Sequence, residues 1–245
     1  MFVVISFVSH HIRADDVGAF AEYAIADERQ VGLKPKKLSW AQAGVVPLVG
    51  LTNLESFYAA GAPWFDKSNV TVVVTSGQGG TGHIAVPMAK ALGATTVIST
   101  ASTDNVEWVK SLGADVVVDF TKETVWSTLP DDSVDVVYDN IGLPGNADAA
   151  MKALRVGGHL VMIQGDLSEH PKDGVSQTRI LCKADDYRKL DTIAAMVDAG
   201  NISDVRVQNT WPLAQIGEAY NEQASGSVVG KVAVSIGSPP NATVQ

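Results

Sequence analysis

The chain has 245 residues, 46% of them hydrophobic, which suits one large or two modest soluble domains. A formal net charge of −9 argues against a nucleic-acid partner, and no apolar run reaches the roughly 18 residues of a membrane span. The single cysteine, Cys182, excludes an intramolecular disulfide and a multi-cysteine zinc site. Residues 1–8 lack the features of a signal peptide, so we expect a cytoplasmic protein.

The first part of the chain carries few clear elements. Residues 1–13 match no predicted element, and strand material is expected over residues 15–33. Ser39 is a candidate N-cap for a helix that begins at the next residue. A second, longer helix is predicted over residues 49–60, where Gly61 follows as its stop.

From residue 70 onward, short apolar runs alternate with helical patterns, as in a parallel sheet covered on both faces. The predicted strands are residues 70–75, 95–99, 116–118, 134–138, 159–164 and 178–183. The predicted helices are residues 81–92, 104–112, 123–129, 146–154 and 186–199. A loop is expected at 166–176, and after the sheet come a strand at 205–207, a helix at 213–223, a strand at 231–236 and a tail at 238–245. The fold class is therefore α/β, a Rossmann-type doubly wound parallel sheet with right-handed crossovers.

Pro87 departs from the local pattern, because it lies inside the helix predicted over residues 81–92. Proline removes one backbone hydrogen bond and clashes with the preceding turn, which costs ~3 kcal/mol unless the helix bends. We therefore predict a kink at this residue.

The clearest functional pattern lies between residues 70 and 82, where a predicted buried strand runs into a glycine turn and then a helix. Three glycines stand there in G-x-G-x-x-G register. Such glycines permit a tight turn, a close approach of a pyrophosphate and close helix–strand packing, while the helix N-terminus faces the phosphates. The alternative is a tight turn without a ligand. We predict a dinucleotide-binding loop made of Ser76, Gly77, Gly79, Gly80, Thr81 and Gly82.

Four stretches carry a family resemblance. They are residues 18–23 with 34–35 and 38–39; residues 47–52; residues 76–82 with 89–94 and 112–115; and residues 139–142 with 157–158 and 230–232. In this order they resemble the medium-chain dehydrogenase/reductase superfamily, on its zinc-free quinone oxidoreductase and enoyl reductase branch. The resemblance covers residues 16–237. It implies a remnant of a GroES-like catalytic domain in residues 1–46, a Rossmann domain in 47–204, a segment returning to the catalytic domain in 205–237, and a tail in 238–245.

The family pattern also implies a longer GroES-like lobe ahead of the nucleotide-binding domain. The beginning of that lobe is absent here, so we expect an N-terminally truncated chain or a natural short form. In the zinc-free branch the groups that position the substrate come largely from this lobe, so no catalytic residue can be assigned. Zinc-dependent relatives place a ligand cysteine in the stretch that corresponds to residues 46–52, where this chain has none. The resemblance therefore implies a site without a metal.

The tip of the second predicted strand, residues 99–103, carries no carboxylate of the kind that holds the ribose diol of NAD(H). A neutral tip relieves repulsion against a 2′-phosphate and favours NADP(H) as the cofactor. However, no Lys or Arg occurs in residues 97–109 to bind that phosphate, and NAD(H) stays the alternative. The candidate hydrogen-bond donors, which could equally serve the strand end and a helix cap, are Ser99, Thr100 and Ser102.

Further cofactor contacts follow from topology, because ligands lie outside the carboxyl ends of parallel strands. These contacts are Asn140, Ile141 and Gly142 after the fourth strand, and Gln164 and Gly165 after the fifth. Thr52 resembles the family threonine near the nicotinamide. We interpret Asp139 as a cap of local backbone, and His83 as a packing residue, rather than as an acid or base.

The resemblance implies an NADP(H)-dependent oxidoreductase that transfers hydride to a small conjugated carbonyl compound such as a quinone, an enal or an enone. One alternative is a catalytically incomplete dinucleotide-binding module. Another is a different Rossmann-like enzyme, such as a methyltransferase, against which the stretches at residues 18–52 and from residue 230 argue. Family members often dimerise through the sheet edge, so the resemblance is consistent with a homodimer.

Overall fold

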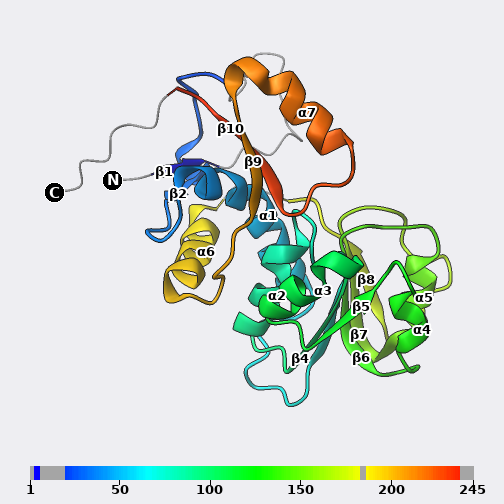
Figure 1. The fold of residues 1–245 in the computed structure, drawn as a ribbon. Coiled ribbons are helices and arrows are strands. Elements are labelled where there is room, and N and C mark those ends of the chain that lie inside the picture. The colour runs from blue at the N-terminus through cyan, green and yellow to red at the C-terminus, as the bar shows by residue number, and fades with distance from the viewer. Residues whose placement is uncertain (1–2, 6–19, 183–185, 238–245) are drawn as a thin grey trace.

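The computed structural model describes residues 3–5, 20–182 and 186–237. Its centre is a six-stranded sheet in the order β5–β4–β3–β6–β7–β8, with every neighbouring pair parallel (Figure 1). The strands are β3 (Thr71–Val74), β4 (Thr96–Ala101), β5 (Val116–Asp119), β6 (Val134–Asp139), β7 (Leu154–Met162) and β8 (Ser176–Arg179). This order confirms the predicted doubly wound sheet. It reverses between β3 and β6, which is the switch point where such sheets bind ligands.

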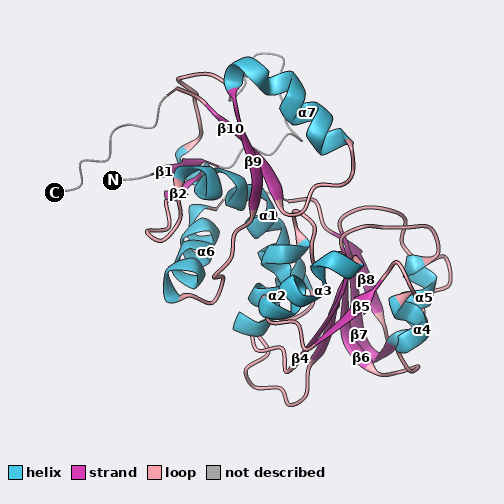
Figure 2. Ribbon diagram, in the orientation of Figure 1, coloured by secondary structure: helices cyan, strands magenta, loops and turns pink. Residues whose placement is uncertain are grey.

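Helices cover both faces of the sheet (Figure 2). They are α1 (Trp40–Ala59), α2 (Gly82–Ala91), α3 (Val106–Ser111), which follows a 3-10 turn at Thr103–Asn105, α4 (Val125–Thr128) and α5 (Asn146–Ala153). Successive residues of β3 point to opposite faces. Val72 and Val74 therefore pack in one core with α1, α2 and α3, whereas Val73 packs in the other core with α4 and α5.

α1 corrects the prediction of two separate helices. It runs for 20 residues without interruption and contains Pro47. The predicted cap is confirmed, because the Ser39 hydroxyl accepts from the Gln42 N–H at 3.2 Å and the Gln42 side chain accepts from the Ser39 N–H at 3.0 Å. An interior proline costs ~3 kcal/mol. The helix tolerates this cost because Pro47 and the apolar side chains that follow it are buried in the core.

A second group of elements packs beside the Rossmann part. β9 (Val207–Pro212), a 3-10 turn (Leu213–Gln215), α7 (Ile216–Ala224) and β10 (Lys231–Ser235) form a unit in which β9 and β10 pair in parallel. β1 (Val3–Ile5) pairs antiparallel with β2 (Val31–Leu33), which follows a 3-10 turn at Glu28–Gln30. α6 (Tyr187–Ala199) packs against α1 and β2. β9, β10 and α7 lie above the sheet in Figure 1.

Several predicted strands have different bounds. Of the strand material expected over residues 15–33, the described part forms a strand only at residues 31–33, where it pairs with β1. The strand predicted at 205–207 lies instead at 207–212, where β10 pairs with it. The last strand of the sheet lies at 176–179 rather than 178–183, and residue 176 ends the predicted loop. The tail after residue 237 lies outside the described residues.

β7 begins at Leu154, directly after α5, and so includes Gly157 and Gly158, which precede the strand predicted at residues 159–164. Leu154 pairs with Val134, and the pairing register shifts before Val136 pairs with His159. Gly157 has a φ of +84°. A glycine in this conformation lets a strand bulge without ending.

α2 continues through Pro87, so the proline does not end the helix. The predicted kink stays a prediction. In the part of the chain that the structure describes, no helix is both long and apolar enough to cross a membrane.

Candidate dinucleotide-binding site

The glycine loop follows β3 and is fastened to the end of β4. Ser76 adopts a left-handed φ of +52°, which is uncommon for a residue other than glycine. Its N–H donates to the Thr100 hydroxyl at 2.8 Å, and the N–H of Gly77 donates to the Thr100 carbonyl oxygen at 2.8 Å. The loop is therefore held in one position at the carboxyl edge of the sheet.

The three motif glycines lie where a side chain would not fit. A methyl group at Gly77 would lie 2.6 Å from a methyl carbon of Val109 on α3 and would overlap the Ser99 hydroxyl. A methyl group at Gly82 would overlap the carbonyl oxygen of Ser76, and one at Gly79 would lie 2.8 Å from the Ser76 hydroxyl. Close packing of the loop on itself and on its neighbours explains the motif.

Gln78, which sequence reasoning missed, joins the loop to two other segments. Its side-chain oxygen accepts from the Ser102 N–H at 2.6 Å and from the Ser102 hydroxyl at 3.0 Å. Its backbone oxygen accepts from the N–H of Gly230 at 2.9 Å. The variable position of a glycine motif carries no pattern that would predict such a role.

The hydroxyl groups predicted as cofactor ligands bond to the protein. Ser99 is fully buried and donates to the carbonyl oxygen of Val74 at 2.7 Å. The hydroxyls of Thr100 and Ser102 bond to the glycine loop as described above. These contacts correspond to the strand-end role that the sequence analysis left open.

The loop after β6 is organised by Asp139. Its buried carboxylate accepts from the Thr75 hydroxyl at 2.7 Å and from the N–H groups of Ile141 and Gly142 at 3.1 and 3.2 Å. The interpretation of Asp139 as a backbone cap is therefore confirmed. Asn140 beside it is 8% exposed, and its side-chain nitrogen has no hydrogen-bond partner in the described structure. Since buried polar groups are normally paired, this nitrogen is suited to a polar ligand.

The loops after β6 and β7 touch each other. A methyl group at Gly142 would lie 2.6 Å from the nitrogen of Gly165 and would overlap Gln164. The two glycines have φ values of +67° and +75°. A cavity of about 240 Å³ is lined by residues 142–145 and 165–169, with part of α5. The structure thus brings together the residues predicted from the fourth and fifth strands.

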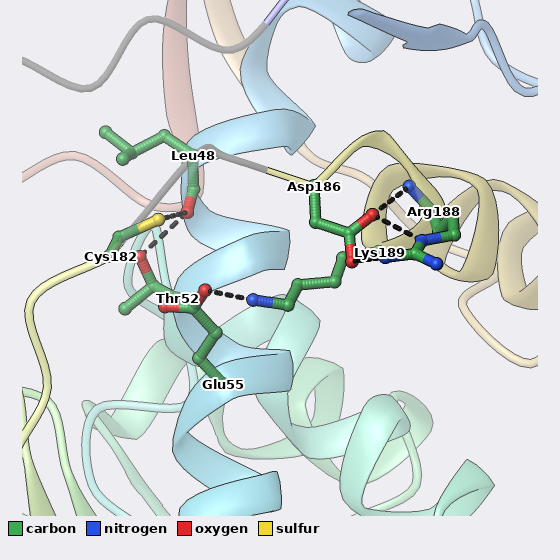
Figure 3. Close-up of polar contacts among 7 residues, drawn as sticks. All are labelled: Leu48, Thr52, Glu55, Cys182, Asp186, Arg188 and Lys189. Carbon is green, nitrogen blue, oxygen red and sulfur yellow. Dashed lines mark hydrogen bonds and ion pairs between the residues drawn. The ribbon is translucent and has the colours of Figure 1, made fainter. Parts of the chain in front are cut away.

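Thr52 lies on α1, beside the segment that follows β8 (Figure 3). Its hydroxyl donates to the Leu48 carbonyl oxygen at 2.7 Å, and the Cys182 sulfur lies 3.9 Å from the same oxygen. One turn further along, Glu55 forms an ion pair with Lys189 of α6 at 2.8 Å. These contacts hold α1 between the sheet and α6.

Asn53 is a second residue that sequence reasoning missed. Its side-chain nitrogen donates to the Thr81 carbonyl oxygen at 3.0 Å, and its side-chain oxygen accepts from the Tyr138 hydroxyl at 2.9 Å. Burial raises the pKa of Tyr138 well above its usual value, so the hydroxyl stays protonated and donates. Asn53 therefore couples α1, and Thr52 with it, to the glycine loop and to β6. An asparagine in an apolar helix beside Thr52 was the available signal.

The C-terminal segment brings one cationic side chain to the glycine loop and a second to α3. A methyl group at Gly80 would lie 2.7 Å from Cδ of Lys231, and burial lowers the pKa of this lysine. The Arg206 guanidinium lies over the Trp108 ring, 4.5 Å from its centroid. Sequence reasoning looked for basic residues along β4 and the helix after it, and so missed both.

His83 packs behind this region and is fully buried. Its Nδ1 lies 2.9 Å from the Gly79 carbonyl oxygen, and because a carbonyl only accepts, Nδ1 carries the proton. Burial lowers the pKa of His83, with smaller contributions from Lys231 and Arg206, against the raising effect of Asp204 and of the Gly79 hydrogen bond. The imidazole is therefore neutral at pH 7, which agrees with its interpretation as a packing residue.

No cluster of three or more His, Cys, Asp or Glu side chains that could hold a metal ion occurs among residues 3–5, 20–182 and 186–237. The site is thus a glycine loop, two touching strand-end loops and a pair of cations at one edge of a parallel sheet. Fold and site together define the class of Rossmann-type dinucleotide-binding proteins.

Comparison with known proteins gives the family. Residues 80–190 match the family described as zinc-binding dehydrogenase. The chain is 32% identical over 220 residues to the 2-methylene-furan-3-one reductase of Solanum lycopersicum, covering 89% of this chain and 52% of the relative. It is also 32% identical over 226 residues to a chloroplastic NADPH-dependent alkenal/one oxidoreductase of Arabidopsis thaliana, covering 89% and 53%.

The fold has counterparts among solved structures. The quinone oxidoreductase of Coxiella burnetii matches with a TM-score of 0.72 at 24% identity, covering 85% of this chain and 65% of that one. The family match and these relatives bear out the resemblance to medium-chain dehydrogenases/reductases that the motifs predict. It spans about half the length of the two curated relatives.

Proposed function

We propose that this chain binds NADP(H) at the glycine loop and serves as the cofactor-binding part of a reductase of conjugated carbonyl compounds. The observation that carries the proposal is the glycine loop at the switch point of the sheet, in a chain whose relatives are named as reductases of an enone and of alkenals and alkenones. The proposed ligand residues are Thr52, Ser76, Gly77, Gly79, Gly80, Thr81, Gly82, Thr100, Ser102, Asn140, Ile141, Gly142, Gln164 and Gly165.

Three features of the site support this ligand. The glycine loop is held in one position directly before the N-terminus of α2, whose free N–H groups suit a phosphate. The Asn140 side-chain nitrogen is buried and has no partner among the described residues, so it can donate to a polar group of the cofactor. Lys231 lies against Gly80, which makes its ammonium the candidate partner of the diphosphate. An anion there would favour the charged lysine and offset the burial that lowers its pKa.

A bound NADP(H) supplies the hydride that such a reduction needs. The residues of this chain contribute position: the glycine loop fixes one end of the cofactor, and the loops after β6 and β7 border the other. We propose that the substrate is a quinone, an enal or an enone. We also propose that the site works without zinc, since residues 46–52 contain no cysteine. Activity that survives removal of metals by a chelator would support this.

The test uses the purified chain of 245 residues. NADPH and NADH are titrated by cofactor fluorescence, and oxidation of the bound cofactor is then followed with an enone and with a quinone. Binding with turnover supports the whole proposal. If a demonstrably folded chain binds neither cofactor, the proposal is wrong.

Lys231→Gln provides the first variant for this test. The diphosphate is common to both cofactors, so loss of the lysine charge should weaken NADPH and NADH by a similar factor, on the order of tenfold. Lys152→Gln is the matched control, because Lys152 is exposed on α5 on the opposite face of the sheet. If Lys231→Gln bound NADPH and NADH as tightly as the wild type, Lys231 would not contact the diphosphate.

A second candidate function is a dinucleotide-binding module without turnover. Binding of NADPH with no oxidation by either substrate would select it. The cytoplasmic location and the homodimer also belong to the proposal. Localisation of the tagged chain and light scattering of the purified protein test these two points.

A further inference from the structure

The tip of β4 offers no basic residue to a 2′-phosphate, but the C-terminal segment brings one to the same region. We propose that Arg206 recognises the 2′-phosphate of NADP(H) and thereby makes the site selective for the phosphorylated cofactor. This inference rests on the proposed function and deepens it, because it assigns the choice between NADPH and NADH to one side chain.

The position of Arg206 is fixed from two directions. Its guanidinium lies over the ring of Trp108, which belongs to α3, the helix that follows β4. Its carbonyl oxygen accepts from the Lys231 N–H at 3.0 Å, and Lys231 itself lies against Gly80. In this fold the diphosphate sits at the glycine loop and the adenosine ribose at the tip of the next strand. Arg206 thus lies beside Lys231, on the α3 side of the loop, where the ribose is expected.

The side chain is available to a ligand. Arg206 is exposed, and within the described ranges no carboxylate forms an ion pair with it. Asp204, two residues away, instead accepts from the Trp108 indole N–H at 2.7 Å. Stacking occupies the flat face of a guanidinium and leaves the N–H groups at its edge to bond. Those groups suit a phosphate, which arginine can bind with two parallel hydrogen bonds.

The surroundings also favour an anion. Arg206 and Lys231 are two positive groups that both act on His83, directly after the glycine loop, in a chain of net charge −9. His83 stacks on the same Trp108 ring, with ring centroids 6.1 Å apart. It is neutral at pH 7 because burial lowers its pKa. A phosphate bound in this region would be attracted by both positive groups.

The experiment compares Arg206→Gln with the wild-type chain and with the control Lys152→Gln, which removes the same charge on the opposite face of the sheet. Dissociation constants are measured for NADPH and NADH, and for the fragments 2′,5′-ADP and 5′-AMP, which differ only in the 2′-phosphate. Loss of charge-assisted hydrogen bonds should weaken NADPH and 2′,5′-ADP by about tenfold or more. Binding of NADH and 5′-AMP should change by less than about twofold, as expected for groups that do not contact Arg206.

Arg206→Lys provides a second check, because it keeps the charge but loses the forked geometry. It should retain part of the preference for NADPH. An unchanged ratio of NADPH to NADH affinity in Arg206→Gln would overturn the inference while leaving the proposed function intact. An equal loss of affinity for NADPH and for NADH would overturn the inference as well, since Arg206 would then only stabilise the fold of the C-terminal segment. A wild-type chain that binds neither cofactor would overturn both proposals.

Discussion

Gly82 shows how tightly the glycine loop is packed. A methyl group there would overlap the backbone oxygen of Ser76, which a rotamer change cannot relieve. Overpacking costs about 1–3 kcal/mol, and because the obstacle is backbone we expect Gly82→Ala to lower the free energy of unfolding by about 3 kcal/mol. Denaturant unfolding measures this effect. Titration with NADPH should show that Gly82→Ala also loses cofactor binding.

Gly44→Ala is the matched control for this substitution. Gly44 lies in α1, is exposed, and has open space around the position of the added methyl group. Alanine is favoured over glycine inside a helix by about 1 kcal/mol, so this variant should be more stable than the wild type. If both alanine variants had the same stability, the steric explanation of Gly82 would be wrong.

Tyr138 and Asn53 make the buried hydrogen bond that joins β6 to α1. Tyr138→Phe removes the donor and leaves the Asn53 side-chain oxygen buried without it. An unsatisfied buried acceptor costs about 1–3 kcal/mol, which urea unfolding would detect. Tyr58→Phe, at a tyrosine that is 43% exposed, should change the stability by less than about 0.5 kcal/mol.

His83 gives the folded chain a sensitivity to acid. Its pKa in the folded chain is lowered by burial from the ordinary value of 6.5, so below pH 6.5 the unfolded chain binds a proton that the folded chain resists. The free energy of unfolding should therefore fall as the pH decreases through this range. We expect the melting temperature of His83→Asn to be lower than that of the wild type at pH 7.5. Between pH 7.5 and pH 5.5 it should fall by less than the melting temperature of the wild type does.

His170→Asn is the control for the pH series, since His170 is exposed. It should keep the pH dependence of the wild type. If His83→Asn also kept it, the acid sensitivity would belong to other groups.

The parts of the site that the sequence predicts are those held together by local geometry. The glycine loop is one short stretch whose glycine spacing predicts the turn that the structure shows. Asp139 caps the backbone N–H groups of the two residues that follow Asn140. Gln78, Asn53, Lys231 and Arg206 were missed because their partners lie far along the chain. Their roles depend on how α1 and the C-terminal segment dock on the sheet, and no local pattern records that.

At the scale of elements, α1 depends on how it begins. Ser39 and Gln42 form a reciprocal pair of hydrogen bonds at its start, and the Gln42 side-chain nitrogen also donates to the Val205 carbonyl oxygen at 3.0 Å. Ser39→Ala should lower the free energy of unfolding by about 1 kcal/mol, the usual worth of a helix N-cap. Thermal unfolding measures it. Ser68→Ala, at an exposed loop serine, should be neutral within about 0.5 kcal/mol.

The elements also show where sequence patterns succeed. Strands and helices between residues 70 and 153 were predicted because β3, β4, β5 and β6 are each a short apolar run that a helix follows. α1 was predicted as two helices, one on each side of Pro47. A proline disfavours a helix interior, and in the structure burial in the core overrides that preference. The bounds of β2, β8 and β9 depend on how many residues the partner strand offers, which is a property of the assembled sheet.

At the scale of the whole molecule, the glycine loop is shared between the Rossmann sheet and the C-terminal unit. The N–H of Gly230 donates to the Gln78 carbonyl oxygen, and Lys231 lies against Gly80. A cofactor that orders the loop should therefore also order the start of β10. We expect hydrogen exchange to slow on NADPH addition in peptides that cover residues 204–212 and 228–235, together with residues 75–83.

Peptides from α5, on the opposite face of the sheet, provide the internal control for the exchange experiment. Their exchange should stay the same. Protection confined to residues 75–83 would show that the loop and the C-terminal unit respond independently.

The single hydrogen bond from Gly230 to Gln78 has a practical consequence for dividing the chain. α6 ends at residue 199, and a shortened chain that stops at residue 204 would keep the whole six-stranded sheet. Such a chain would lack the donor to the Gln78 carbonyl, the lysine beside Gly80 and the arginine on Trp108. The proposed nucleotide-binding site is therefore discontinuous in sequence, and its last residues come after residue 204.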